Sequence, residues 1–145
     1  MAYSTYSFED ISCTISHPQF GQFVANGTGI GSISTVMTTD RSAHDLAADG
    51  VVMVSRIKAR NGTHAISAQQ TSELNRWLLR LFNFLDSQST AQWARITITM
   101  RAPQMGEMIT STGVSFQKLP DRPYQQQGQQ VNWTLMAANI SQQTI

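Results

Sequence analysis

Apolar and polar residues alternate over most of this chain, which is the pattern of β-strands that bury one face. Near the start, Ile11, Cys13 and Ile15 alternate with hydroxyl residues, so Cys13 is expected to point inward as a small buried hydrophobe. The same alternation predicts strands at residues 32–39, 51–60, 63–70, 94–101, 107–119 and 130–137. With a short strand after Pro18, the total comes to about seven or eight strands.

Two dipeptides mark expected turns. Asn61-Gly62 is the strongest hairpin signal in the chain, so residues 63–70 are expected to return antiparallel to residues 51–60. Asp49-Gly50 predicts a turn in the connection that precedes residue 51.

The last two predicted strands each have one apolar face. In the first, three evenly spaced residues form this face, Met108, Val114 and Phe116, and Gly113 is the place for a β-bulge. In the second, the face consists of Val131, Trp133 and Leu135.

One segment changes its period from two to between three and four, which predicts a helix over about residues 72–86. Thr71 or Ser72 is suited to cap this helix, and Glu73 lies where the helix dipole favours a carboxylate. Its apolar stripe consists of Leu74, Trp77, Leu78, Leu81, Phe82 and Leu85. A single amphipathic helix in a β-rich chain most simply closes one side or one open end of a sheet.

These elements predict a mainly β fold, an antiparallel β-sandwich or small barrel with one flanking α-helix. The length of 145 residues fits one domain, residues 1–145, with a core of its own.

Composition adds that the surface is polar but nearly uncharged. Hydrophobic residues make up 41% and charged residues only 13%, while Ser, Thr and Gln occur fifteen times each. A polar, weakly charged surface suits contact with further protein copies. The net charge of +1 gives no electrostatic footprint for nucleic acid or membrane, and Arg56, Lys58 and Arg60 are interpreted as a solvated basic ladder on one strand.

Catalytic chemistry is missing from the sequence. His17, His44 and His64 stand in separate segments without metal-ligand spacing. The run GTGIG is followed by β-branched residues rather than by a helix, which argues against a phosphate loop. We therefore expect no enzyme activity, no cofactor and no metal. The start of the chain lacks the blocks of a signal peptide, which predicts a cytoplasmic product.

Four motifs in a fixed order carry a resemblance: YSFEDI near the start, ADG in the middle, FQKLPD at residues 116–121, and the VNW strand after a glutamine-rich loop. In this order the chain resembles the tail tube proteins of contractile-tailed bacteriophages over essentially its whole length. It is similar, too, to the tube proteins of type VI secretion systems and pyocins.

The resemblance implies a structural subunit that forms hexameric rings, stacked into a tube through which DNA passes as transient cargo. It implies sheath, baseplate and tail-terminator partners, assembly in the host cytoplasm and a place in the virion tail. It brings no catalytic or cofactor residues. Residues 1–7, residues 37–50 and the tail NISQQTI would become ordered only on stacking.

In such a subunit, the functional residues are those that line the channel or contact neighbouring copies. Hydroxyl residues suit a channel wall that is wet but does not hold DNA, and the expected wall residues are Thr97, Thr99 and the Ser and Thr of residues 110–115, including Thr110 and Thr112. Arg95 and Arg101 flank the first run and are expected to pair across subunits, because free cations would bind DNA. The expected contacts between subunits or rings are Asp40, Arg41, Asp45, Arg122, Tyr124 and Gln126.

Two other classes of function stay open at this point. Trp93, Trp133 and Tyr124 beside polar loops would suit a β-sandwich that binds carbohydrate or a host surface, unless the tryptophans pack in the core. A small hydrolase is the third class, for which the sequence proposes no residues.

Overall fold

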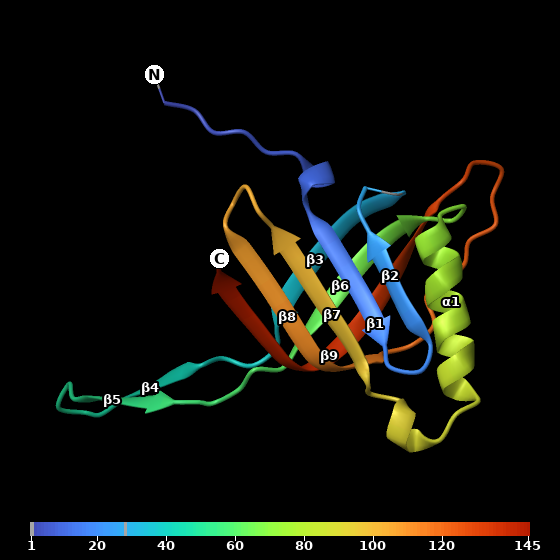
Figure 1. The fold of residues 1–145 in the computed structure, drawn as a ribbon. Helices are drawn as coiled ribbons and strands as arrows, with labels where there is room; N and C mark the ends of the chain where they lie inside the picture. The colour runs from blue at the N-terminus through green and yellow to red at the C-terminus, as the bar shows by residue number, and fades with distance from the viewer. Residues whose placement is uncertain (1, 28) are drawn as a thin grey trace.

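A computed structural model describes residues 2–27 and 29–145, which form a curled antiparallel sheet packed against one helix (Figure 1). The sheet has seven strands in the order β2-β1-β7-β8-β9-β6-β3, and a two-stranded ribbon, β4-β5, projects away from it. The strands are β1 (Ser12–His17), β2 (Gly21–Ala25), β3 (Ile30–Met37), β4 (Ser42–Leu46), β5 (Val52–Arg56), β6 (Gly62–Gln69), β7 (Ile96–Ala102), β8 (Glu107–Phe116) and β9 (Gln130–Thr144). The helix α1 is Glu73–Asp86, and two 3-10 turns are η1 (Phe8–Asp10) and η2 (Thr90–Gln92).

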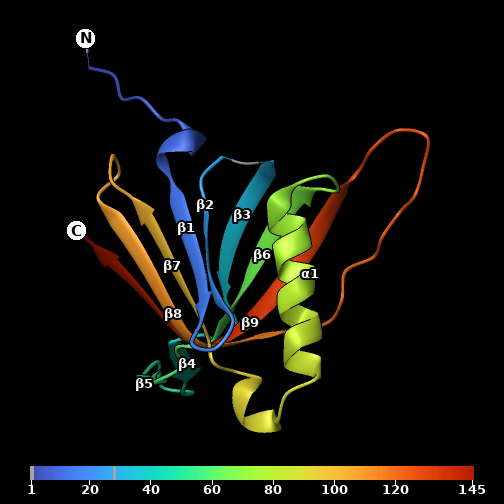
Figure 2. The same ribbon diagram turned by 45° about the vertical axis from the view of Figure 1, so that its right-hand side comes forward.

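Helix α1 lies along the concave side of the curled sheet (Figure 2), and the buried apolar side chains of both form the core. β2 and β3 are consecutive in the chain, so the curl brings the two edges of the sheet near each other at one end. Trp133 on β9 is fully buried and stacks edge-on against Phe116 of β8, with ring centroids 5.6 Å apart. The predicted mainly β fold with one helix is confirmed.

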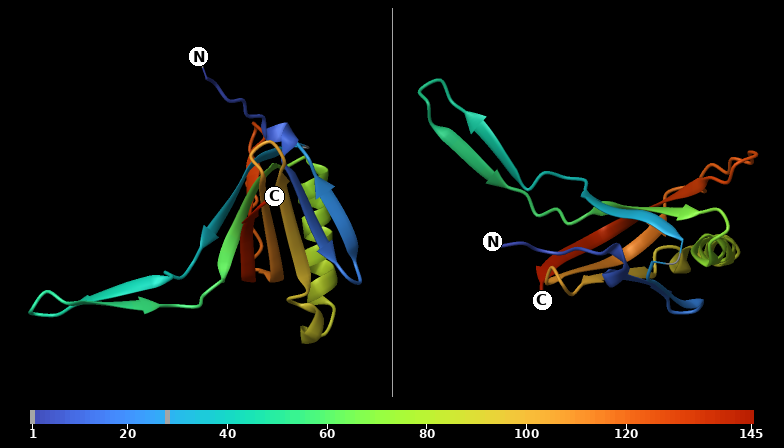
Figure 3. Two further views of the ribbon diagram at one scale, coloured as in Figure 1. Left: turned by 60° about the vertical axis from the view of Figure 1, so that its left-hand side comes forward. Right: turned by 90° about the horizontal axis from the view of Figure 1, so that it is seen from above.

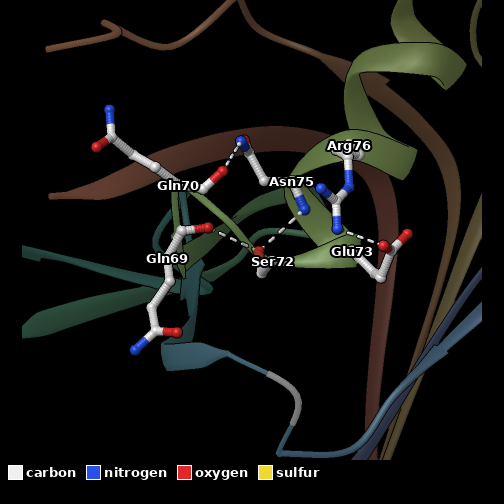
Figure 4. A network of polar contacts seen from close by, with 6 residues as sticks. All are labelled: Gln69, Gln70, Ser72, Glu73, Asn75 and Arg76. Carbon is white, nitrogen blue, oxygen red and sulfur yellow. Dashed lines mark hydrogen bonds and ion pairs between the residues drawn. The ribbon is translucent and has the colours of Figure 1, made fainter. Parts of the chain in front are cut away.

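The predicted helix is confirmed, and Ser72 rather than Thr71 caps it (Figure 4). The Ser72 Oγ accepts a hydrogen bond from the backbone N–H of Asn75 at 3.2 Å and donates one to the Gln69 carbonyl at 2.7 Å. The buried Asn75 amide then accepts a hydrogen bond from the Trp133 indole N–H at 3.0 Å. The first turn of α1 is thereby tied to the centre of the sheet.

The expected hairpin at Asn61-Gly62 is wrong. β5 pairs with β4, whereas β6 pairs with β3 and β9. Gly62 does not turn the chain back: it begins β6 where a side chain would not fit, because an added Cβ would lie 2.5 Å from the Val36 carbonyl oxygen. A glycine at this position therefore allows β6 to pack closely against β3.

Asp49-Gly50 instead closes a hairpin, the ribbon β4-β5. Gly50 has a φ of 91° and donates its N–H to the Ala47 carbonyl at 3.0 Å, while the Asp49 carboxylate accepts the Val51 N–H at 3.2 Å. β5 ends at Arg56, so the predicted ladder of three basic residues on one strand is not present: Lys58 and Arg60 lie in the connection to β6.

The predicted bulge at Gly113 is confirmed, and it changes which residues share a face. Gly113 has a φ of 65°, and the pairing of β8 with β7 shifts register beside it. Met108 pairs with the exposed Arg101, whereas Val114 pairs with the buried Ile96, so Met108 is not on the apolar face with Val114. β9 runs through the tail to Thr144, which pairs with Glu107. The tail is therefore a strand within one subunit.

Candidate assembly surfaces

The convex face of the sheet, opposite α1, carries mostly hydroxyl and amide side chains, with the exposed Val24, Val36 and Met136 among them. Strand pairing places Thr14, Thr99, Thr110 and Ser141 side by side across four strands. Thr97 and Thr112 lie on the same face, so the structure brings all four predicted wall threonines together. The hydroxyl and amide residues of this face include Ser12, Thr14, Ser16, Thr63, Ser67, Thr97, Thr99, Thr110, Thr112, Ser115, Thr134, Asn139 and Ser141.

Charge is nearly absent from this convex face. Among its strand residues that the structure describes, Arg101 is the charged one, and it lies beside Ser12 and Met108 at the end of β7 nearest the N-terminus. Arg95 precedes β7 at the opposite end of the strand. The two arginines that flank Thr97 in the sequence are therefore separated by the length of β7.

One hydroxyl of residues 110–115 turns inward. Ser111 is fully buried, and its Oγ lies 2.6 Å from Nε2 of the fully buried His64. Nδ1 of His64 lies 2.9 Å from the Thr35 hydroxyl on β3. Burial lowers the pKa of His64, so the ring is neutral and donates to one hydroxyl while accepting from the other. The sequence offers no signal for this link, because its residues are far apart in the chain.

The ribbon β4-β5 with its root, residues 40–57, extends away from the sheet and is named the arm here (Figure 3). Asp40, Arg41 and Asp45 all lie on it and are exposed. Its root is fixed by Arg41, whose Nε donates to the Ile57 carbonyl at 2.9 Å, while the Ile57 N–H donates to the Arg41 carbonyl at 2.9 Å.

Apolar side chains on the arm are left in solvent. Leu46 is 71% exposed, Val52 46% and Val54 63%. Leu46 pairs directly with Val52, and Val54 is two residues farther along the same strand, so the three share one face of the arm. This set is named the arm strip. No strand of the described chain covers it, and such a surface marks a site of protein contact.

The glutamine-rich connection, residues 117–129, is tied at its base. The Gln70 side chain accepts the Gln129 N–H at 3.0 Å and donates to the Pro123 carbonyl. Arg122 lies with its guanidinium 5.9 Å from the centre of the Trp133 ring. Of the three contact residues predicted here, Arg122 thus folds onto its own chain, while Tyr124, 86% exposed, and Gln126 point into solvent.

The cysteine is buried, and metal-ligating side chains do not cluster in the described residues. Burial raises the pKa of the Cys13 thiol to about 12, so it is not a nucleophile at neutral pH. No group of three or more His, Cys, Asp or Glu within residues 2–27 and 29–145 could hold a metal ion.

The carbohydrate-binding alternative loses one of its three aromatic residues, Trp133, to the core. Trp133 is fully buried, and Trp93 packs edge-on against Phe82, 5.9 Å between ring centroids. Tyr124 is exposed and Trp93 is partly exposed, so Trp133 is the aromatic residue of the three that no ligand can reach.

Membrane crossing by a helix is not seen: within the described part of the chain, no helix has both the length and the apolar character to span a bilayer.

Solved structures with the same fold come from contractile injection systems. One is the PVC sheath-tube complex of an extracellular contractile injection system in its extended state, with a TM-score of 0.60 and 11% identity over 99% of this chain and 93% of that chain. A second is the cap that terminates the anti-feeding prophage tube, with a TM-score of 0.59 and 11% identity over 100% and 94%. A third is the six-fold symmetrised baseplate of the anti-feeding prophage, with a TM-score of 0.60 and 12% identity over 99% and 98%.

Sequence comparison gives the more specific result. No curated protein matches the chain. The profile of a family described as the bacteriophage PhiTE tail tube protein matches residues 3–144, and the identities of 11% and 12% to the solved structures show a shared fold alone. Because the profile covers nearly all of the sequence and the fold agrees with it, this chain belongs to the bacteriophage PhiTE tail tube protein family.

Proposed function

We propose that copies of this subunit close into rings, that the rings stack into a tail tube, and that the convex face of the sheet lines the channel. The observation that carries the proposal is this broad face of hydroxyl and amide groups with almost no charge. Hydroxyl groups keep a wall hydrated. A wall of this kind has almost no cations to bind the DNA phosphates and release their counterions, so DNA could pass without being held.

Ring closure has a physical reason in the sheet. β2 and β3 are its edges, and edge strands present backbone N–H and C=O groups that favour pairing with another chain. Six copies per ring are proposed because the six-fold symmetrised baseplate of the anti-feeding prophage has the same fold. The single Arg101 of each copy would form a circle of cations at one mouth of the channel only.

The projecting elements, the arm and the glutamine-rich connection, make the contacts between neighbouring subunits and between rings. The arm carries Asp40, Arg41 and Asp45, and the glutamine-rich connection carries Tyr124 and Gln126. Arg122 makes no contact between subunits in this proposal; it holds the connection against Trp133 of its own chain. The opposite side of the subunit presents α1, whose outer residues, including Arg76 and Arg80, are exposed. In a tube with the convex face inside, α1 faces outward.

The outward side would meet the other parts of the tail. The structures with this fold include a sheath-tube complex, a tube-terminating cap and a baseplate. We propose the same classes of partner here: a sheath around α1, a terminator at one end and a baseplate at the other. The location is then the virion tail, after assembly in the host cytoplasm.

Electron microscopy of the purified full-length protein tests the proposal. Negatively stained samples are expected to show rings with a central hole, or stacks of such rings. Sedimentation velocity on the same samples should show a species of ring mass. A protein that stays monomeric across the whole accessible concentration range, with no annular particles, would contradict the proposal.

A further inference from the structure

An open hollow of about 340 Å³ lies at the end of the sheet near the N-terminus. Besides four polar residues, Thr35, Arg101, Glu107 and Gln142, it is lined by apolar side chains from η1, from the turn between β7 and β8, and from the concave face of the sheet. Among them are Phe8, Ile11, Ile33, Met105 and Ile109. This hollow is named the end pocket. Met105 is 51% exposed and Tyr6 66% exposed at its rim, so an apolar surface is left open here as well.

The end pocket and the arm lie at opposite ends of the subunit. The arm leaves the sheet where β3 ends and β6 begins, while η1 and the turn between β7 and β8 mark the other end (Figures 1 and 3). The arm therefore cannot reach the pocket of its own chain. A head-to-tail contact between copies would cover two different apolar surfaces at opposite ends of the subunit, and such contacts extend into filaments where the rotation does not close into a ring.

Charge supports the same match. Glu9, Asp10 and Glu107 lie at the end of the subunit that holds the pocket, against one cation, Arg101, and both Glu107 and Arg101 line the pocket itself. The arm strip continues into Arg56, two residues beyond Val54 on the same strand face, and Lys58 and Arg60 follow in the connection to β6. A copy that buries its arm strip in the pocket thus brings Arg56 and the basic residues after it toward the acidic residues at the end of the next copy.

The arm has the dimensions for such a contact. β4 and β5 have five residues each, and strands rise about 3.3 Å per residue, so the ribbon is about 16 Å long. That length lets the strip enter a pocket of the next copy while the root stays on its own sheet.

We propose that the end pocket receives the arm strip of a second copy of this chain in the neighbouring ring, with Arg56 of the arriving arm beside Glu107. This inference rests on the proposed function and names both surfaces of the contact between rings. It gives the tube a direction, because every ring presents arms at one face and pockets at the other.

Cross-linking between two singly substituted full-length proteins tests the pairing. One carries Val54→Cys on the arm strip and the other Met105→Cys at the pocket rim; both positions are exposed, so folding should be retained. The native Cys13 is buried and does not compete. Mild oxidation of a mixture assembled into tubes should link the two variants into mixed dimers. A matched mixture of Val54→Cys with Val24→Cys, exposed on the convex face, should give none.

Charge exchange tests the proposed neighbours. Arg56→Glu and Glu107→Arg should each raise the protein concentration needed for tube assembly by about tenfold, and the double variant should restore it to near the wild-type value. Tubes without mixed dimers, or single variants that the double variant does not rescue, would overturn the pocket while leaving the tube function standing. Absence of any rings would instead count against the proposed function itself.

Discussion

At the scale of single residues, His64 of β6 links the neighbouring strand β3 to β8, which lies beyond β9 in the sheet. Its ring joins Thr35 of the edge strand β3 to Ser111 of β8, and it has no exposed surface. The inward residues paired with it, Thr35 and Leu135, carry no charge. A proton on this ring would place a charge in an apolar interior with no counterion, which is why burial lowers its pKa below the ordinary 6.5.

This lowered pKa predicts acid sensitivity. Unfolded chains take up the proton at higher pH than folded chains do, so stability present above about pH 6.5 is lost as the pH falls through that value toward the folded pKa. Urea denaturation between pH 7.5 and pH 5 should show the free energy of unfolding falling, and falling less in His64→Gln.

His44→Gln on the exposed arm is the matched control and should keep the wild-type slope. His64→Gln itself is expected to lose about 1–3 kcal/mol at neutral pH, because it leaves a buried hydroxyl without its partner. Equal slopes in wild type and His64→Gln would show that another group causes the acid sensitivity.

At the scale of elements, α1 and its start show how local chemistry is joined to the sheet. Ser72 satisfies the N–H of Asn75, and the Asn75 side chain in turn accepts from Trp133 and donates to the Gln70 carbonyl at 3.1 Å. Gln70 then holds the glutamine-rich connection at Gln129. The helix start, the centre of β9 and the polar connection therefore form one continuous network.

Removal of the cap measures this coupling. Ser72→Ala should lower the free energy of unfolding by about 1–2 kcal/mol, because an amide N–H of the first turn loses its acceptor. Thr71→Ala is the matched control: Thr71 is exposed and makes no capping bond, so its loss should change stability by less than about 0.5 kcal/mol. Thermal or urea denaturation measures both variants. A larger loss in Thr71→Ala than in Ser72→Ala would contradict the assignment of the cap.

At the scale of the whole molecule, the sequence predicted what depends on near neighbours and missed what depends on partners far along the chain. The stripe of α1, the inward Cys13 and the bulge at Gly113 follow from local periodicity, and the structure has all three. Asn61-Gly62 misled, because the same dipeptide that favours a hairpin also supplies a glycine for the close approach of β3.

The candidate surfaces divide in the same way. Alternation placed Thr97 and Thr99 on a common face, and the strand pairing shows that Thr110, also predicted for the wall, lies beside Thr99. Ser111 instead turns inward, and its hydrogen-bond partner His64 comes from a strand 47 residues away in sequence. No pattern in the chain indicated that residues 42–46 form a strand, since all of them are exposed and their pairing with β5 leaves no buried face to produce alternation.

The neutral channel wall makes a prediction about the assembled tube. Thr99→Lys on the convex face adds one cation per subunit, and hence a ring of them, to a surface whose other strand charge is Arg101. Tubes assembled with short duplex DNA should then retain it in a salt-dependent way, whereas wild-type tubes should not, because added phosphate contacts release counterions. Asn83→Lys, exposed on α1 on the opposite side, is the matched control.

Nuclease added after assembly distinguishes DNA inside the channel from DNA on the outer surface. DNA held by Thr99→Lys tubes should be protected, and DNA bound by Asn83→Lys tubes should be digested. If both are digested alike, the convex face does not line the channel, and the wall must be sought on another surface of the subunit.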